Sequence, residues 1–125
     1  AIFKLELLEN GIHARSIIEE NRGNNTYKQL CELLPIVKKH QFERLTIASN
    51  TLHLPRIEAT LQYVPELAEL KNITEAISAD EIVMKKDPSW KPIIEKAYQS
   101  EPILGIIAKE KQGVEQIKKG TYKFK

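Results

Sequence analysis

LTIASNTLHLPR, residues 45–56, decides the fold, because within it an apolar run gives way to the start of a helix. Arg44–Ala48 is typical of a buried strand, and Leu54–Val64 has the apolar spacing of a helix. Pro55 fits the first turn of that helix, where backbone amides have no intrahelical partner. The turn between the two elements holds an amide, a hydroxyl and an imidazole, so it can either start the helix or grip a ligand.

Apolar periodicity predicts the other elements as well. In chain order, they are a helix over 2–9, a buried strand over Arg15–Glu19, a helix over Tyr27–His40, short helical pieces over Glu66–Ile77, a third strand over Glu81–Met84, a helix from Asp87 to about Gln99, and a helix from Pro102 that Gly120 closes. Strand, helix, strand, helix is the order of a βαβ unit with parallel strands. A complete parallel sheet is covered on both faces, so we expect part of the domain to lie outside this sequence.

Composition excludes several classes of function. The chain has 125 residues, 42% of them apolar and 29% charged, which is the balance of one globular domain. A net charge of +2 is too small to indicate nucleic-acid binding. The single cysteine, Cys31, rules out an internal disulfide and a multi-cysteine zinc site. With no membrane span and no signal peptide we expect a cytoplasmic protein, although an anchor upstream of Ala1 would lie outside this sequence.

Polar residues follow both early strands at the point where each strand is predicted to end. The first strand runs into Glu20–Thr26, and the second runs into Ser49, Asn50 and Thr51. In a parallel sheet both turns lie at the same edge, where open α/β sheets bind ligands. Each turn also opens a helix, so free backbone amides point at one crevice. Arg56 shares a helix face with His53, and this set suits a phosphate, a carboxylate or another anionic group.

Simpler explanations exist for the same residues. Asn and Thr are favoured helix caps, so both turns can serve only to start helices. His53 can be a surface histidine, and Arg56 can pair with Glu58 or Glu20. A metal site finds little support, because the three histidines have no ligand-like spacing and no HxxxH or CxxC occurs. No GxGxxG is present for a dinucleotide.

Two segments together resemble the paired signature of the YdcF/SanA/ElyC family. They are EENRGNNTYKQL at 19–30 and LTIASNTLHLPRIEATL at 45–61. The family has a Glu, then Asn-Thr-Tyr opening a helix, and later His-x-Pro-Arg after a strand. The corresponding residues here are Glu20, Asn25, Thr26, Tyr27, His53, Pro55 and Arg56. The departures are Gly23 in place of the usual Ser, Ser49–Asn50 in place of Thr-Ser, and Leu30 in place of Ala.

The resemblance implies a partial Rossmann-like α/β fold, a three-layer parallel sheet of which this chain holds the second half. Residues 1–78 would be that half, and 79–125 a helical C-terminal extension packed on it. A missing N-terminal half, or a second chain, would complete the sheet. One family member is associated with S-adenosylmethionine, and membrane-anchored members are linked to the cell envelope. The resemblance implies these ligand-binding residues: Glu20, Asn25, Thr26, Ser49, Asn50, His53 and Arg56.

Two functions of different classes therefore compete. The first is a domain that binds a small anionic or nucleotide-like ligand, with S-adenosylmethionine as the candidate cofactor and enzymatic activity left open. In that hypothesis Arg56 holds the negative group, and His53 and Glu20 are the candidate acid–base pair. The second is a non-catalytic interaction or scaffold domain whose polar motif residues only cap helices.

Overall fold

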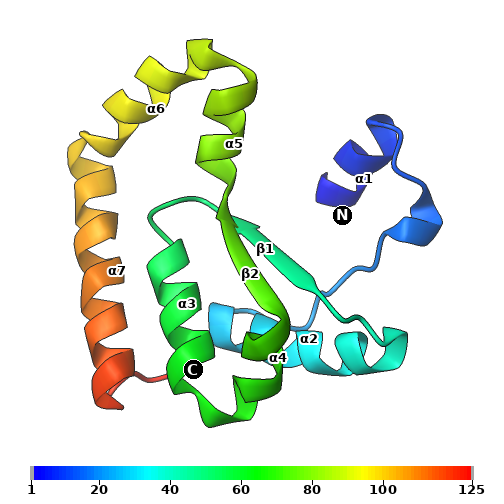
Figure 1. Ribbon diagram of the computed structural model, residues 1–125. Coiled ribbons are helices and arrows are strands. Elements are labelled where there is room, and N and C mark those ends of the chain that lie inside the picture. The colour runs from blue at the N-terminus through cyan, green and yellow to red at the C-terminus, as the bar shows by residue number, and fades with distance from the viewer. Residues whose placement is uncertain (1, 125) are drawn as a thin grey trace.

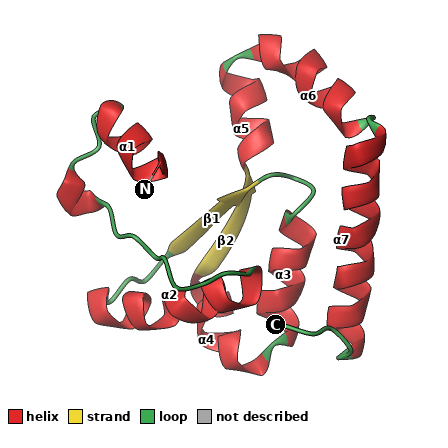
Figure 2. Cartoon of the chain, turned by 180° about the vertical axis from the view of Figure 1, so that it is seen from behind, coloured by secondary structure: helices red, strands yellow, loops and turns green. Residues whose placement is uncertain are grey.

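The computed structural model describes residues 2–124 of an α/β chain that is mostly helical (Figures 1 and 2). Its helices and strands in chain order are α1 (Ile2–Glu9), α2 (Thr26–His40), β1 (Leu45–Ser49), α3 (Leu54–Tyr63), α4 (Ala68–Ile73), β2 (Thr74–Ser78), α5 (Ala79–Lys86), α6 (Lys91–Tyr98) and α7 (Glu101–Lys119). Short 3₁₀ turns lie at Ala14–Ser16, Pro65–Leu67 and Pro88–Trp90.

The centre of the fold is a βαβ unit, but it lies one element later in the chain than we predict, because the expected first strand does not form and Thr74–Ser78 supplies the second. β1 and β2 pair in parallel, from Leu45 opposite Thr74 to Ser49 opposite Ser78, and α3 and α4 form the connection between them. The helix that we predict at Leu54–Val64 is confirmed as α3, and Pro55 lies in its first turn. The turn at Ser49–His53 therefore leaves the carboxyl end of β1 and enters α3 directly.

The core lies between one face of this sheet and the helices. Its buried residues, from α2, α3 and the segment around α4, are Leu30, Ile57, Leu61, Val64, Leu67 and Leu70. Leu45 and Ile47 of β1 pack against them. Because α2 and α3 meet in the same cluster, their first turns come close together. On the opposite face of the sheet Thr46, Ala48 and Glu75 are exposed.

α2 ends at His40, as the sequence predicts, and begins at Thr26, one residue before the predicted start. Asn25 is its N-cap, and the Asn25 side chain accepts a hydrogen bond from the amide of Lys28. Pro35 lies inside the helix without ending it. At its C-terminus Gln41 adopts the left-handed conformation, with a φ of 55°.

Two predicted strands are wrong. Arg15–Glu19 begins in a 3₁₀ turn and continues without regular structure, and Ile18 is exposed. No described strand lies beside it, so its backbone groups cannot pair in a sheet. Glu81–Met84 belongs to α5, because Ser78 caps that helix by accepting from the amide of Glu81. The second strand of the sheet lies instead at Thr74–Ser78, where we expected helical pieces as far as Ile77.

The C-terminal helices form an arch that returns to α3. β2 continues into α5, α6 crosses over, and α7 runs down beside α3 (Figure 1). The predicted helices from Asp87 and Pro102 are confirmed, and Gly120 closes α7 at a φ of 73°. Gly113 of α7 is buried, and a Cβ there would lie 3.5 Å from Arg56 Cδ. This close approach brings α7 against the face of α3 that carries Arg56.

α1 stands apart from the other helices in both views (Figures 1 and 2). The helix predicted at 2–9 is confirmed. Its apolar side chains are open to solvent: Phe3 is 81% exposed and Leu5 is 60% exposed. One ion pair, between Lys4 and Glu19, ties α1 to the segment that follows it.

Over residues 2–124, no helix has both the length and the apolar character that crossing a bilayer requires.

Candidate functional site

His53 and Arg56 lie at the start of α3, held there by local hydrogen bonds. The Asn50 side chain accepts from the backbone amide of His53 at 3.0 Å, which fixes the turn before the helix. Arg56 is one helical turn further on, and its carbonyl accepts from the Thr60 hydroxyl at 2.7 Å. The imidazole and the guanidinium consequently project on the same side of α3, as their spacing predicts.

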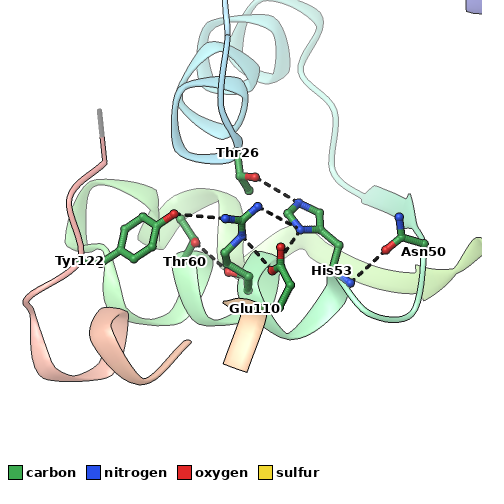
Figure 3. A network of polar contacts seen from close by, with 7 residues as sticks. Thr26, Asn50, His53, Thr60, Glu110 and Tyr122 are labelled. Carbon is green, nitrogen blue, oxygen red and sulfur yellow. Dashed lines mark hydrogen bonds and ion pairs between the residues drawn. The ribbon is translucent and has the colours of Figure 1, made fainter. Parts of the chain in front are cut away.

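A polar network joins four segments around these two side chains (Figure 3). His53 Nε2 is 3.1 Å from the Thr26 hydroxyl on α2, and His53 Nδ1 is 3.3 Å from Glu110 Oε2 on α7. Arg56 Nε lies 3.0 Å from the same Glu110 oxygen. Arg56 Nη1 donates to the Tyr122 hydroxyl at 3.2 Å. The network thus connects the beginnings of α2 and α3 to α7 and to the chain after it.

The Arg56–Glu110 contact is an ion pair rather than a well-aligned hydrogen bond. Although the two atoms are 3.0 Å apart, the buried Arg56 Nε has no acceptor in hydrogen-bond geometry among the described residues. The two side chains are 27% and 12% exposed, so water screens their attraction only in part. Arg56 Nη2 also lies 3.2 Å from His53 Nδ1. The imidazole nitrogen therefore has two neighbours that compete for it.

A cavity of about 380 Å³ opens between the start of α2, α3 and the end of the chain. Its described lining residues are Asn24, Asn25, Thr26, Tyr27, Gln29, Arg56, Thr60, Tyr122, Lys123 and Phe124. Two of these residues are cations, and none of them is a carboxylate. The first turn of α2 adds amides, since no described residue accepts from the backbone N–H of Thr26 or Tyr27. Positive charge and free N–H donors thus meet at one cavity.

The structure brings only some of the expected site residues together. Thr26, His53 and Arg56 form one network, and Asn25 lines the same cavity as Thr26 and Arg56. Ser49 lies in a smaller space of about 210 Å³, which Thr26 and His53 also line. Asn50 reaches the network only through the backbone of His53.

Glu20 is not the partner of His53 that we expected. Its carboxylate accepts from the amides of Arg22 and Gly23, at 2.5 and 2.9 Å, and so closes its own turn. It lines a separate space of about 410 Å³ with Glu32 and Lys39. The strand that would have aimed Glu20 at the sheet edge does not form. Glu110 occupies the place beside His53 instead.

Sequence patterns did not predict that Glu110, Tyr122 or Lys123 lies at the site. All three lie more than fifty residues after His53, and they reach the site only because α7 packs on α3. The one local signal is Gly113, a glycine inside a helix, which marks the close approach of two helices.

A second polar cluster lies at the carboxyl ends of both strands. The Thr51 hydroxyl and the Ser78 hydroxyl are 2.6 Å apart, and the Thr51 amide donates to Asp80 at 3.0 Å. The Tyr98 hydroxyl donates to the same Asp80 oxygen. Burial raises the pKa of the Tyr98 phenol, and the hydrogen bond to Asp80 raises it further. This cluster fastens α5 and α6 to the turn that precedes α3.

Among residues 2–124, no group of three or more His, Cys, Asp or Glu side chains could hold a metal ion. Comparisons with protein families, with curated proteins and with solved structures find no match to this chain.

Proposed function

We propose that this protein binds a small anionic ligand in the cavity between α2, α3 and residues 122–124. The observation that carries the proposal is the lining of that cavity. Arg56 and Lys123 are its charged residues, and it has no described carboxylate. The free amides at the start of α2 add the positive end of a fifteen-residue helix. A phosphate or carboxylate placed there lies near both cations and near these amides.

The size of the cavity favours a ligand of nucleotide scale over a bare ion. Its volume of about 380 Å³ falls in the range of small-molecule sites, roughly 300–1,000 Å³. Tyr27, Tyr122 and Phe124 supply aromatic surface at its wall, and their rings pack on one another. A flat ring with an anionic group, as in a nucleotide or S-adenosylmethionine, matches this combination. The likeness to the YdcF/SanA/ElyC signature supports the same ligand class.

Calorimetric titration of the purified protein with inorganic phosphate, ATP and S-adenosylmethionine tests the proposal. Arg56→Met keeps the aliphatic stem but removes the charge, and we expect the affinity to fall by about tenfold or more, since a charged hydrogen bond contributes about 1.5–3 kcal/mol. Arg44→Met is the matched control, because Arg44 is exposed and does not line the cavity. Equal affinities for wild type and Arg56→Met would refute the proposed anion contact.

The scaffold alternative has specific observations of its own. Asn25 and Asn50 do accept hydrogen bonds from amides at the starts of α2 and α3. Arg56 already contacts Glu110 and Tyr122. A thermal-shift screen separates the two functions, because a ligand at 100 times its dissociation constant stabilises the folded state by roughly 2.7 kcal/mol. If the protein is only a scaffold, no nucleotide or anion raises its melting temperature.

We also propose that the two strands belong to a larger Rossmann-like sheet, completed by a further chain segment or a second chain. The exposed sheet face at Thr46, Ala48 and Glu75 supports this, as do the uncovered apolar side chains of α1. Parallel sheets are normally covered on both faces. Light scattering of the purified chain distinguishes the two completions. A dimer that Phe3→Asp dissociates identifies a second copy, and a monomer at all concentrations excludes that copy.

A further inference from the structure

Thr26, His53 and Glu110 are arranged as a hydroxyl, an imidazole and a carboxylate in series (Figure 3). The Thr26 hydroxyl meets one ring nitrogen of His53 at 3.1 Å, and Glu110 meets the other at 3.3 Å. This is the order of groups in a nucleophile–base–carboxylate triad. We propose that Thr26 is a nucleophile that accepts the acyl group of an anionic ester, with His53 as its base and Glu110 as the positioning residue. The choice of an anionic ester rests on the proposed function.

His53 can act as the base for Thr26 only in one of its two tautomers. With its proton on Nδ1, facing Glu110, the ring leaves Nε2 free to accept the proton of the Thr26 hydroxyl. Arg56 Nη2, 3.2 Å from Nδ1, is a donor and favours the opposite tautomer. Arg56 also lines the cavity. An anionic substrate that draws the guanidinium toward the cavity leaves Nδ1 to Glu110 alone, so substrate binding completes the series.

The chemistry balances with the ester and one water molecule as its reactants. Thr26 Oγ attacks the carbonyl carbon of the ester, and its proton passes to His53 Nε2. The bond to the leaving oxygen breaks, and His53 returns the proton to that oxygen, which releases an alcohol and leaves Thr26 acylated. Water then attacks the acyl group with the same base, giving a carboxylic acid and free Thr26. The unused amides of Thr26 and Tyr27 lie in the same turn as the nucleophile, where they can stabilise the oxyanion.

The burial of the three groups is compatible with this role. His53 and Glu110 side chains are 22% and 12% exposed, so water reaches the ring but the carboxylate is largely shielded. Thr26 lines two cavities, the larger one beside Arg56 and the smaller one beside His53. A substrate in the larger cavity therefore has the hydroxyl at its wall and the imidazole behind that hydroxyl.

The test uses two chromogenic esters, neutral 4-nitrophenyl acetate and the anionic mono-4-nitrophenyl ester of succinic acid. Release of nitrophenol gives the acylation rate, and peptide mass spectrometry locates the acyl group. We expect the succinyl ester to acylate Thr26. The rate at Thr26 should fall by about a hundredfold in His53→Gln, as loss of a general base predicts. Thr26→Ser should retain it, and Thr26→Val, which has the same shape, should abolish it.

Two further variants separate this role from a structural one. Glu110→Gln should slow acylation without changing the ester concentration that gives half-maximal rate, and Glu110→Asp should restore part of the rate. Melting temperatures of all variants are measured, and Thr26→Val keeps the Asn25 cap, so we expect it to fold. Arg56→Met should lose the preference for the succinyl ester.

Three results decide the matter. Acylation of Thr26 by the succinyl ester, lost in Thr26→Val and His53→Gln, supports the proposal. Absence of acyl groups on Thr26 with both esters overturns it, whatever the affinity of the cavity for anions. Acylation of Thr26 by both esters at equal rates overturns the choice of an anionic ester, whereas the proposed function is decided separately by the calorimetric titrations.

Discussion

The ion pair between Arg56 and Glu110 should hold α7 against α3 with measurable energy. The two atoms are 3.0 Å apart, and in an effective dielectric constant of about 20 their Coulomb attraction is about 5.5 kcal/mol. Desolvation and side-chain ordering offset most of this. Exposed pairs contribute about 0.2–1 kcal/mol, and breaking a buried pair costs about 3–5 kcal/mol. With side chains 27% and 12% exposed, we expect a coupling energy of about 1–2 kcal/mol.

A double-mutant cycle measures that coupling. Arg56→Met keeps most of the aliphatic stem that faces Gly113, and Glu110→Gln keeps the shape of the carboxylate, so each change removes charge with little change in packing. Urea unfolding of the wild type, both single variants and the double variant gives the free energies of unfolding. The coupling should weaken in 1 M salt, where the Debye length is about 3 Å. A coupling energy within about 0.3 kcal/mol of zero would refute this account of how α7 is fastened.

Three other changes have expected outcomes. Asn25→Ala should lower the free energy of unfolding by about 1 kcal/mol in urea, because the side chain caps α2. Gly105→Ala should raise the melting temperature and Gly120→Ala should lower it, each by an amount equivalent to about 1 kcal/mol, since Gly120 has a positive φ and Gly105, inside α7, does not. Stability should fall above about pH 10, because burial raises the pKa of Tyr98 and a hydrogen bond to Glu66 raises the pKa of Tyr27, and both shifts favour folding only while the phenols stay protonated. Tyr98→Phe should reduce that fall.

For each of these three predictions, a control variant or a specific result would show that its physical explanation is wrong. Asn24→Ala should be near neutral, because no described residue donates to that side chain. If Asn24→Ala cost as much as Asn25→Ala, the cap would not explain the loss. Stabilisation by Gly120→Ala would contradict its left-handed conformation. An unchanged alkaline slope in Tyr98→Phe would show that another group controls stability there.

Local signals predicted the central part of the fold. The strand at Arg44–Ala48 and the helix at Leu54–Val64 are confirmed because apolar spacing, Pro55 and the intervening turn all favour the same structure. The strand at Arg15–Glu19 fails for the opposite reason. A short apolar run is compatible with a strand. A strand also needs a second strand to pair with, and a short stretch of sequence does not show whether one is present. Glu81–Met84 is helical instead, because Ser78 caps the start of α5 by accepting from the amide of Glu81.

The sequence predicted the part of the candidate site that α2 and α3 contribute, but not the part that α7 and the residues after it contribute. The expectation that the loops around Thr26 and His53 are neighbours agrees with the 3.1 Å contact between them. The two loops are neighbours for a different reason from the one we predict, however. They come together because α2 and α3 pack into one core, and not because two strands end at the same sheet edge. Glu110 and Tyr122, which lie far along the chain from His53, complete the network. Apolar periodicity predicts helices and strands but not which of them pack together, so it could not predict these contacts. The ligand itself stays a prediction.

The way α7 and residues 122–124 close the cavity has a consequence for folding kinetics. Contacts within the βαβ unit join residues nearer in sequence than Thr26 and Tyr122, so loop-closure entropy favours their earlier formation. An early folding intermediate would then lack a finished cavity and could not recognise a ligand. Saturating ligand should therefore slow unfolding while leaving the refolding rate almost unchanged. In stopped-flow experiments only the unfolding limb of the chevron would move.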